Sequence, residues 1–174
     1  MNEKSDLAVS TGLIPDPLET PPQESPPSSP RVRVAAVIVE DGKLLMVRHV
    51  KGNESYWLLP GGGVDYGESL TEALERELVE EASVKIRVGD LVLANDSIAP
   101  DRSRHTVNLY FEAEIVSGVI QRGIDERVVE VRFIPLDELS SIRVFPDVRE
   151  PLLKAIACGF TGTETYLGKL WKPA

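Results

Sequence analysis

Residues 62–84 read GGVDYGESLTEALERELVEEASV, a glycine-rich loop followed by a segment with helical periodicity. Ser69 and Glu72 form an S-x-x-E capping box, which predicts that a helix begins directly after the loop. The apolar and charged residues then repeat with the period of an α-helix up to Ala82. We therefore expect a helix over residues 69–82, preceded by a loop whose glycines let the backbone approach a ligand.

The predicted helix has an apolar face and an adjoining acidic face. The apolar stripe, which is expected to face the core, consists of Leu70, Leu74 and Leu78. The acidic face consists of Glu77, Glu80 and Glu81. Because like charges at these helical spacings repel one another, the arrangement costs stability unless a cation lies among them. The pattern therefore predicts a cation-binding face beside the core.

The chemistry of this face favours a hard divalent cation. Carboxylate oxygens are preferred ligands of Mg²⁺, which commonly joins a few carboxylates to substrate phosphates. The two histidines, His49 and His105, are isolated in the sequence, so a zinc hydrolase is not favoured and each is interpreted as an ordinary surface or strand residue. Arg76 is the one basic residue of segment 61–84, and it is expected to pair with a carboxylate and fix its rotamer.

Strand patterns flank the predicted helix on both sides. Arg31–Glu40 and Lys43–His49 are rich in apolar residues around an Asp41-Gly42 pair, which predicts a β-hairpin. Further strands are expected at Tyr56–Leu59, Val84–Ala94, His105–Val116 and Val128–Ile134. A short helical turn is expected at Pro135–Leu139 and a helix at Glu150–Cys158. Strands on both sides of a central helix predict an α/β fold in which helices cover a mixed sheet.

Residues 62–81 contain the motif G-x5-E-x7-R-E-L-x-E-E, which resembles the signature of the Nudix hydrolases. The resemblance extends in the order of elements over residues 31–139 and implies the Nudix α/β/α sandwich with a central mixed β-sheet. One position departs from the family pattern, since Ser83 stands where the family has Gly. We expect Ser83 to end the helix in a left-handed conformation, which costs a residue other than Gly about 1 kcal/mol. The change is expected to affect stability and not metal binding.

The resemblance also implies a metal site and its ligands. The implied ligands of Mg²⁺, with Mn²⁺ as the alternative metal, are the Gly62 carbonyl and the carboxylates of Glu77, Glu80 and Glu81. Arg76 would orient one ligand carboxylate, and Glu68 would support the site or bind an additional metal.

In several family members a further acid, from a loop outside the motif, serves as a ligand or base. Asp125 and Glu126 lie in the corresponding loop, and Glu126 is the candidate, with a solvated loop acid as the alternative interpretation. The residues implied to be catalytic are thus Arg76, Glu77, Glu80 and Glu126.

The substrate class implied by the resemblance is a nucleoside diphosphate linked to another group. Family members that act on ADP-ribose often have a proline about sixteen residues beyond the motif, and Pro100 occupies that place here. Arg102 and Arg104 follow it and are candidate substrate-binding residues. Dinucleoside polyphosphates and nucleoside triphosphates stay open as substrates, as does a non-catalytic Nudix module that senses a nucleotide.

Composition excludes several other classes of protein. The 174 residues include 28 Asp and Glu against 19 Lys and Arg, a net charge of −9, so no basic footprint for nucleic acid is expected. The longest apolar run, residues 34–39, is too short to span a membrane, and no secretory signal is evident. The single cysteine fits a reducing compartment, so we expect a cytoplasmic protein.

The chain divides into a tail and one domain. Residues 1–30 contain seven of the 13 prolines and few core-forming residues, which predicts a flexible tail before a Nudix domain over residues 31–174. A small-molecule nucleotide is the expected partner, without nucleic acid or membrane, and a homodimer is left open.

Overall fold

Two β-sheets form the centre of the fold, described over residues 29–171 in a computed structural model. The first sheet has the strand order β1–β6–β5–β8. Its strands are β1 (Arg31–Val37), β5 (Val84–Ile98), β6 (His105–Gly118) and β8 (Tyr166–Lys169). Because β1 runs parallel to β6 whereas β5 and β6 are antiparallel, this sheet is mixed, as expected.

The second sheet is antiparallel and centres on β3. It contains β2 (Val39–Glu40), β3 (Lys43–Lys51), β4 (Glu54–Leu58) and β7 (Val128–Pro135). The predicted hairpin is confirmed, since β2 pairs with β3 across Asp41 and Gly42, whose φ angles of 47° and 70° suit a tight two-residue turn. The predicted strand Arg31–Glu40 serves both sheets, because its first part pairs with β6 and its end with β3.

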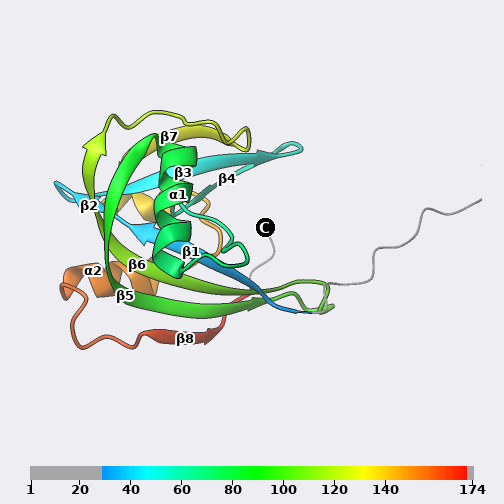
Figure 1. The fold of residues 1–174 in the computed structure, drawn as a ribbon. Coiled ribbons are helices and arrows are strands. Elements are labelled where there is room, and N and C mark those ends of the chain that lie inside the picture. Colours follow the sequence, from blue (N-terminus) through cyan, green and yellow to red (C-terminus); the bar gives the residue numbers. More distant parts are fainter. Residues whose placement is uncertain (1–28, 172–174) are drawn as a thin grey trace, which may run out of the picture.

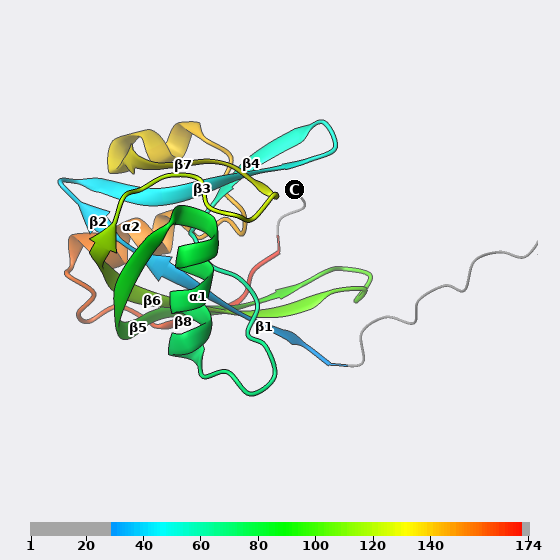
Figure 2. The same cartoon turned by 45° about the horizontal axis from the view of Figure 1, so that its top comes forward.

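Two helices cover opposite faces of β1, which gives the expected α/β/α layering. They are α1 (Leu70–Ala82) and α2 (Arg149–Ala157), and a 3₁₀ turn, η1 (Leu136–Ser141), precedes α2. Alternate residues of β1 face two cores: Val34 packs with Leu74 of α1, and Ala35 belongs to the cluster that contains Leu152 of α2. Figures 1 and 2 show α1 on one side of this sheet and α2 on the other.

The two ends of α1 follow the sequence prediction closely. The Ser69 side chain accepts a hydrogen bond from the Glu72 N–H, and the Glu72 carboxylate accepts one from the Ser69 N–H, so the capping box is confirmed. Ser83 ends the helix in the left-handed region, with φ 59° and ψ 29°. Leu74 and Leu78 are buried, but Leu70 is 37% exposed. The expectation that Leu70 faces the core is wrong because it lies in the first turn, next to an exposed loop.

Other parts of the sequence prediction have mixed outcomes. The helix and helical turn near the C-terminus are confirmed as α2 and η1, whereas the sequence did not predict β8. Apart from residues 29 and 30, the predicted tail lies outside the described residues. Within residues 29–171, no helix combines the length and the apolarity needed to cross a membrane.

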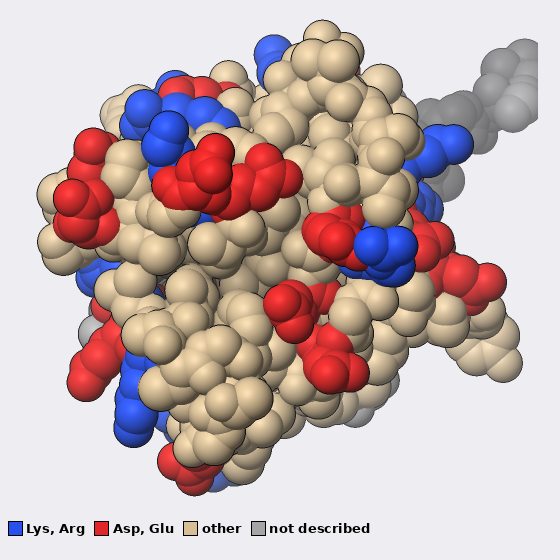
Figure 3. Space-filling view, turned by 90° about the vertical axis from the view of Figure 1, so that its left-hand side faces the viewer, with Lys and Arg blue, Asp and Glu red and all other residues tan. Residues whose placement is uncertain are grey.

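Charged side chains are scattered on the end of the molecule that carries β2. Figure 3 shows small acidic and basic groups on this face, separated by uncharged surface. A nucleic-acid backbone requires a continuous basic stripe or patch, and this face of the described chain has none.

Candidate active site

Helix α1 directs its acidic face against the glycine loop that precedes it. Glu77 and Glu81 are buried, with exposed fractions of 5% and 1%, and the Glu80 side chain lies at the rim with 36% exposed. Carboxylates are almost never this buried unless they are paired or bind a cation. Glu77 and Glu81 therefore adjoin the core, as their helical spacing predicts, whereas Glu80 lies at its edge.

Arg76 lies at the centre of the acidic cluster and binds several of its members. Its Nε donates to Glu68 Oε1 at 2.7 Å, and its Nη1 donates to Glu77 Oε1 at 2.9 Å. The same Nη1 lies 3.5 Å from Glu80 Oε2, and Nη2 donates to the Gly63 carbonyl at 3.0 Å. Arg76 thus fixes the loop as well as the carboxylates, more than the single pairing expected from the sequence.

The pKa values of two carboxylates in the cluster, Glu68 and Glu77, shift in opposite directions. Hydrogen bonds from the Arg76 side chain and the Asp65 N–H lower the pKa of Glu68 to about 2. Burial raises the pKa of Glu77, and the nearby Glu81 charge adds to the increase, although the hydrogen bond from Arg76 opposes it. Burial therefore outweighs the hydrogen bond from Arg76 in setting the direction of the Glu77 shift.

The glycine loop packs directly on the buried carboxylates. The Gly61 N–H donates to Glu81 Oε2 at 2.7 Å. A Cβ on Gly62 would overlap the Glu77 carboxylate, so any other residue at this position would displace that carboxylate. The Gly62 carbonyl, an implied metal ligand, accepts a hydrogen bond from the Val34 N–H at 2.9 Å, which leaves its second lone pair available.

The chemistry of these residues fits a divalent cation. Glu77 Oε2 is buried and has no hydrogen-bond partner in the described part of the chain, and the carboxylates of Glu80 and Glu81 lie on the same helix face. Among residues 29–171, no three acidic, histidine or cysteine side chains already surround one point as metal ligands do. Arg76 supplies positive charge to the cluster, 2.9 Å from Glu77 Oε1 and 3.5 Å from Glu80 Oε2.

His49 lies at the site, although its isolated position in the sequence predicted no role there. Its Nε2 is 3.5 Å from Glu81 Oε1 and makes no hydrogen bond, and its imidazole ring is 6.1 Å from the Tyr56 ring. His49 reaches the cluster from β3, which is distant in sequence from α1. Only the packing of β3 against the loop could have revealed this neighbour.

The loop that contains Glu126 is anchored to the C-terminal end of α1. The N–H groups of Gly123 and Asp125 donate to the carbonyls of Glu81 and Glu80, both at 3.1 Å. These bonds satisfy carbonyls that a helix end leaves without intrahelical partners. The Asp125 side chain is 10% exposed and is held by Arg127, whereas Glu126 is exposed on the same loop. The role of Glu126 stays a prediction.

The predicted substrate residues lie in the connection between β5 and β6. Pro100 and Arg102 are exposed, and this turn is closed by a hydrogen bond from the Ala99 N–H to the Arg104 carbonyl at 2.9 Å. The Arg104 guanidinium lies over the Trp171 ring, 5.3 Å from its centroid. Trp171 was not a candidate from the sequence, because only the pairing of β8 with β5 brings it here.

Comparison with known proteins identifies the family of this chain. A family model described as the NUDIX domain matches residues 29–156. An ADP-ribose pyrophosphatase of Methanocaldococcus jannaschii is 30% identical over 115 residues, which cover 65% of this chain and 66% of that protein. The phosphatase NudJ of Escherichia coli (strain K12) is 34% identical over 134 residues, which cover 76% of this chain and 85% of that protein. The chain therefore belongs to the Nudix family of hydrolases, which act on pyrophosphate bonds.

Solved structures confirm the fold. A NUDIX hydrolase from Nitrosomonas europaea superposes with a TM-score of 0.68 at 24% identity, over 75% of this chain and 90% of that chain. A UDP-X diphosphatase superposes with a TM-score of 0.64 at 27% identity, over 82% of this chain and 68% of that chain.

Proposed function

We propose that this protein is a Mg²⁺-dependent pyrophosphohydrolase that cleaves a nucleoside diphosphate linked to another group. The observation that carries the proposal is the buried, unpartnered Oε2 of Glu77 on a helix face shared with Glu80 and Glu81. A side chain in this state is stabilised by a bound cation, and the substrate diphosphate is an anion that such a cation would neutralise.

The proposed roles follow from the positions of the side chains. Glu77, Glu80 and Glu81, with the Gly62 carbonyl, would hold Mg²⁺, which supplies charge neutralisation on the diphosphate when bound. Arg76 orients Glu77 through its 2.9 Å hydrogen bond, and it also holds Glu68 in place. Glu126 is the proposed acid from outside the motif, with access to an attacking water at the rim of the cluster. The reducing cytoplasm is the proposed location.

ADP-ribose, cleaved to AMP and ribose phosphate, is the proposed substrate. Two observations support it: Pro100 follows the motif at the spacing common among ADP-ribose enzymes, and the relative from Methanocaldococcus jannaschii is named an ADP-ribose pyrophosphatase. Dinucleoside polyphosphates and nucleoside triphosphates are the alternatives within the same chemistry. Pro100, Arg102 and Arg104 are proposed to contact the part of the substrate beyond the diphosphate.

The test is a comparison of kcat/KM for ADP-ribose, diadenosine tetraphosphate and nucleoside triphosphates, each with Mg²⁺ and with EDTA. We expect Mg²⁺-dependent AMP release from ADP-ribose to be the fastest reaction. Glu80→Gln should lose most of the turnover, whereas Glu75→Gln, the same change at an exposed position of α1, should retain it.

The substrate comparison also distinguishes the ADP-ribose assignment from the hydrolase proposal. Preference for either alternative substrate would overturn the ADP-ribose assignment but leave the hydrolase proposal intact. Binding of nucleotides without turnover of any of them would identify a sensing module instead.

A further inference from the structure

A pocket lined by residues outside the acidic cluster is connected to the glycine loop through Arg33. We call it the aromatic pocket; among its lining residues are Arg33, Ser97, Arg104, Asn108, Phe145 and Trp171. Arg33 connects it to the cluster, since one guanidinium nitrogen donates to the carbonyls of Leu59 and Gly61 at 2.9 and 3.0 Å. The Gly61 N–H in turn binds the buried Glu81 carboxylate. Arg33, which lines the aromatic pocket, is therefore linked through two hydrogen bonds to Glu81, a proposed metal ligand.

A row of rings gives a second connection between the cluster and the pocket. It begins at His49, which is 3.5 Å from Glu81, and continues through Tyr56 and Phe145 to Trp171. Successive ring centroids are 6.1, 6.0 and 6.4 Å apart. Figures 1 and 2 show the hairpins β3–β4 and β5–β6, which carry much of this surface, projecting from the same side of the molecule.

Trp171 is held in the pocket by the strand that precedes it. β8 pairs with β5, and the Leu170 N–H donates to the Asp96 carbonyl at 2.8 Å. The indole then packs edge to face with Phe145, at an interplanar angle of 89°, and lies 5.3 Å from the Arg104 guanidinium. The half-buried indole is thus fixed as one wall of an open pocket rather than packed in the core.

Two side chains in the pocket offer hydrogen-bond donors to a ligand. Arg33 Nη1 is buried and has no partner within residues 29–171, although the other nitrogen of this guanidinium is hydrogen-bonded. Ser97 Oγ accepts from Asn95 and Asn108 at 3.2 and 3.0 Å, which occupies both lone pairs and leaves its O–H to donate. A buried donor without a partner costs about 1–3 kcal/mol, so the pocket favours a ligand that carries acceptor atoms.

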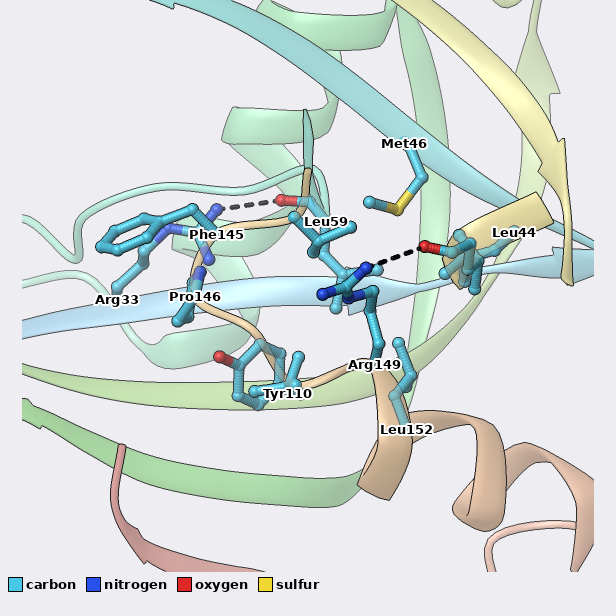
Figure 4. Close-up of a pocket in the computed structure, with 12 residues that line it drawn as sticks. Arg33, Leu44, Met46, Leu59, Tyr110, Phe145, Pro146, Arg149 and Leu152 are labelled. Carbon is cyan, nitrogen blue, oxygen red and sulfur yellow. Dashed lines mark hydrogen bonds between the residues drawn. The ribbon is translucent and has the colours of Figure 1, made fainter. Parts of the chain in front are cut away.

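The aromatic pocket differs in volume from the core cavity beside it. The core cavity in Figure 4, which shares Arg33 and Phe145 with the pocket, has a volume of about 10 Å³ and holds at most one water molecule. The aromatic pocket has a volume of about 100 Å³, and an adjoining space that also borders Ser97 and Trp171 has about 160 Å³. These two spaces admit a planar organic group, whereas the core cavity does not.

We propose that the aromatic pocket binds the base of the nucleotide substrate, with the Trp171 ring stacked on one face of the base, Phe145 at its edge and Arg33 donating to an acceptor at its edge. The proposal rests on the proposed function, because that function supplies a nucleotide whose diphosphate lies at the acidic cluster. A base has π faces that stack on aromatic rings and edge atoms that accept hydrogen bonds, which a sugar or a phosphate does not combine. Trp171 is therefore a specificity-determining residue.

The experiment compares a ligand that carries a base with one that lacks it. The Kd values of AMP and ribose 5-phosphate are measured by calorimetry without metal for the wild type, Trp171→Leu and the conservative Trp171→Phe. Stacking on an aromatic ring is worth about 1–3 kcal/mol, so Trp171→Leu should raise the Kd of AMP about tenfold. Trp171→Phe keeps a ring and should recover most of this loss. Both variants should leave the Kd of ribose 5-phosphate unchanged.

Tyr166→Phe is the matched control, because it removes a hydroxyl that donates to Asp96 from β8 and leaves the pocket intact. It should bind AMP as the wild type does. An equal loss of affinity for both ligands in Trp171→Leu, or no loss for AMP, would overturn the proposal. So would a wild type that binds AMP no better than ribose 5-phosphate. If binding depends on Trp171 but no nucleotide is hydrolysed, the base pocket stands and the proposed function fails.

Discussion

The burial of Glu77 makes its negative charge the most informative one to remove. Glu77→Gln keeps the size of the side chain and an acceptor for Arg76, 2.9 Å away, but it eliminates the charge. Glu77 is 5% exposed and its Oε2 has no partner, so the charge destabilises the metal-free protein. An unsatisfied buried group costs about 1–3 kcal/mol, and Gln still leaves one polar atom there, so we expect a net stabilisation of ~1 kcal/mol.

The sign of the pH dependence follows from the raised pKa of Glu77. Burial raises this pKa, so the folded protein favours the protonated carboxyl. The wild type therefore loses stability as pH rises through the pKa of Glu77 in the folded state. The advantage of Glu77→Gln should be present at neutral pH and disappear below the ordinary Glu pKa of about 4.3.

Magnesium should reverse the order of the two proteins. A ligand at one hundred times its Kd stabilises the folded state by ~2.7 kcal/mol, which for a chain of this size is roughly 5–10 °C in Tm. The wild type should gain this increment, and Glu77→Gln should lose most of it because a proposed metal ligand is missing. The assay is thermal denaturation with EDTA and with saturating Mg²⁺.

Glu75→Gln is the control for this experiment, since it removes the same charge from an exposed position of α1. It should leave both the metal-free Tm and the Mg²⁺ increment close to those of the wild type. A Glu77→Gln protein that is less stable without metal, or that retains the full Mg²⁺ increment, would refute the reasoning.

Two further predictions concern Ser83 at the C-terminal end of α1 and Glu68, which pairs with Arg76 of α1. Ser83→Gly should stabilise the protein by ~1 kcal/mol, because Ser83 has φ 59°, and Ser83→Ala, which keeps the Cβ, should give no such gain in thermal denaturation. The pKa of Glu68 is lowered to about 2 by the hydrogen bond from Arg76, so its contribution to stability is present above about pH 4.3 and lost as pH falls towards 2. Urea denaturation at several pH values should show this loss in the wild type and not in Glu68→Gln.

The helix and its acidic face could be predicted from the sequence because both depend on local spacing. The capping box between Ser69 and Glu72 fixes where α1 begins, and the 100° rotation per residue fixes which side chains share a face. Ser83 at the end of α1 was predicted correctly for the same reason. Leu70 was not, because a position in the apolar stripe does not say whether the sheet extends as far as that turn.

The sequence by itself determined the motif, the family and the carboxylates of α1, since each depends on residues that are neighbours along the chain or around one helix. Only the tertiary structure decided what faces them. His49 reaches Glu81 from β3, and Trp171 reaches Arg104 and Phe145 through the pairing of β8 with β5. These contacts join residues far apart in the chain, and no local pattern encodes them, because they depend on how the two sheets pack around the glycine loop.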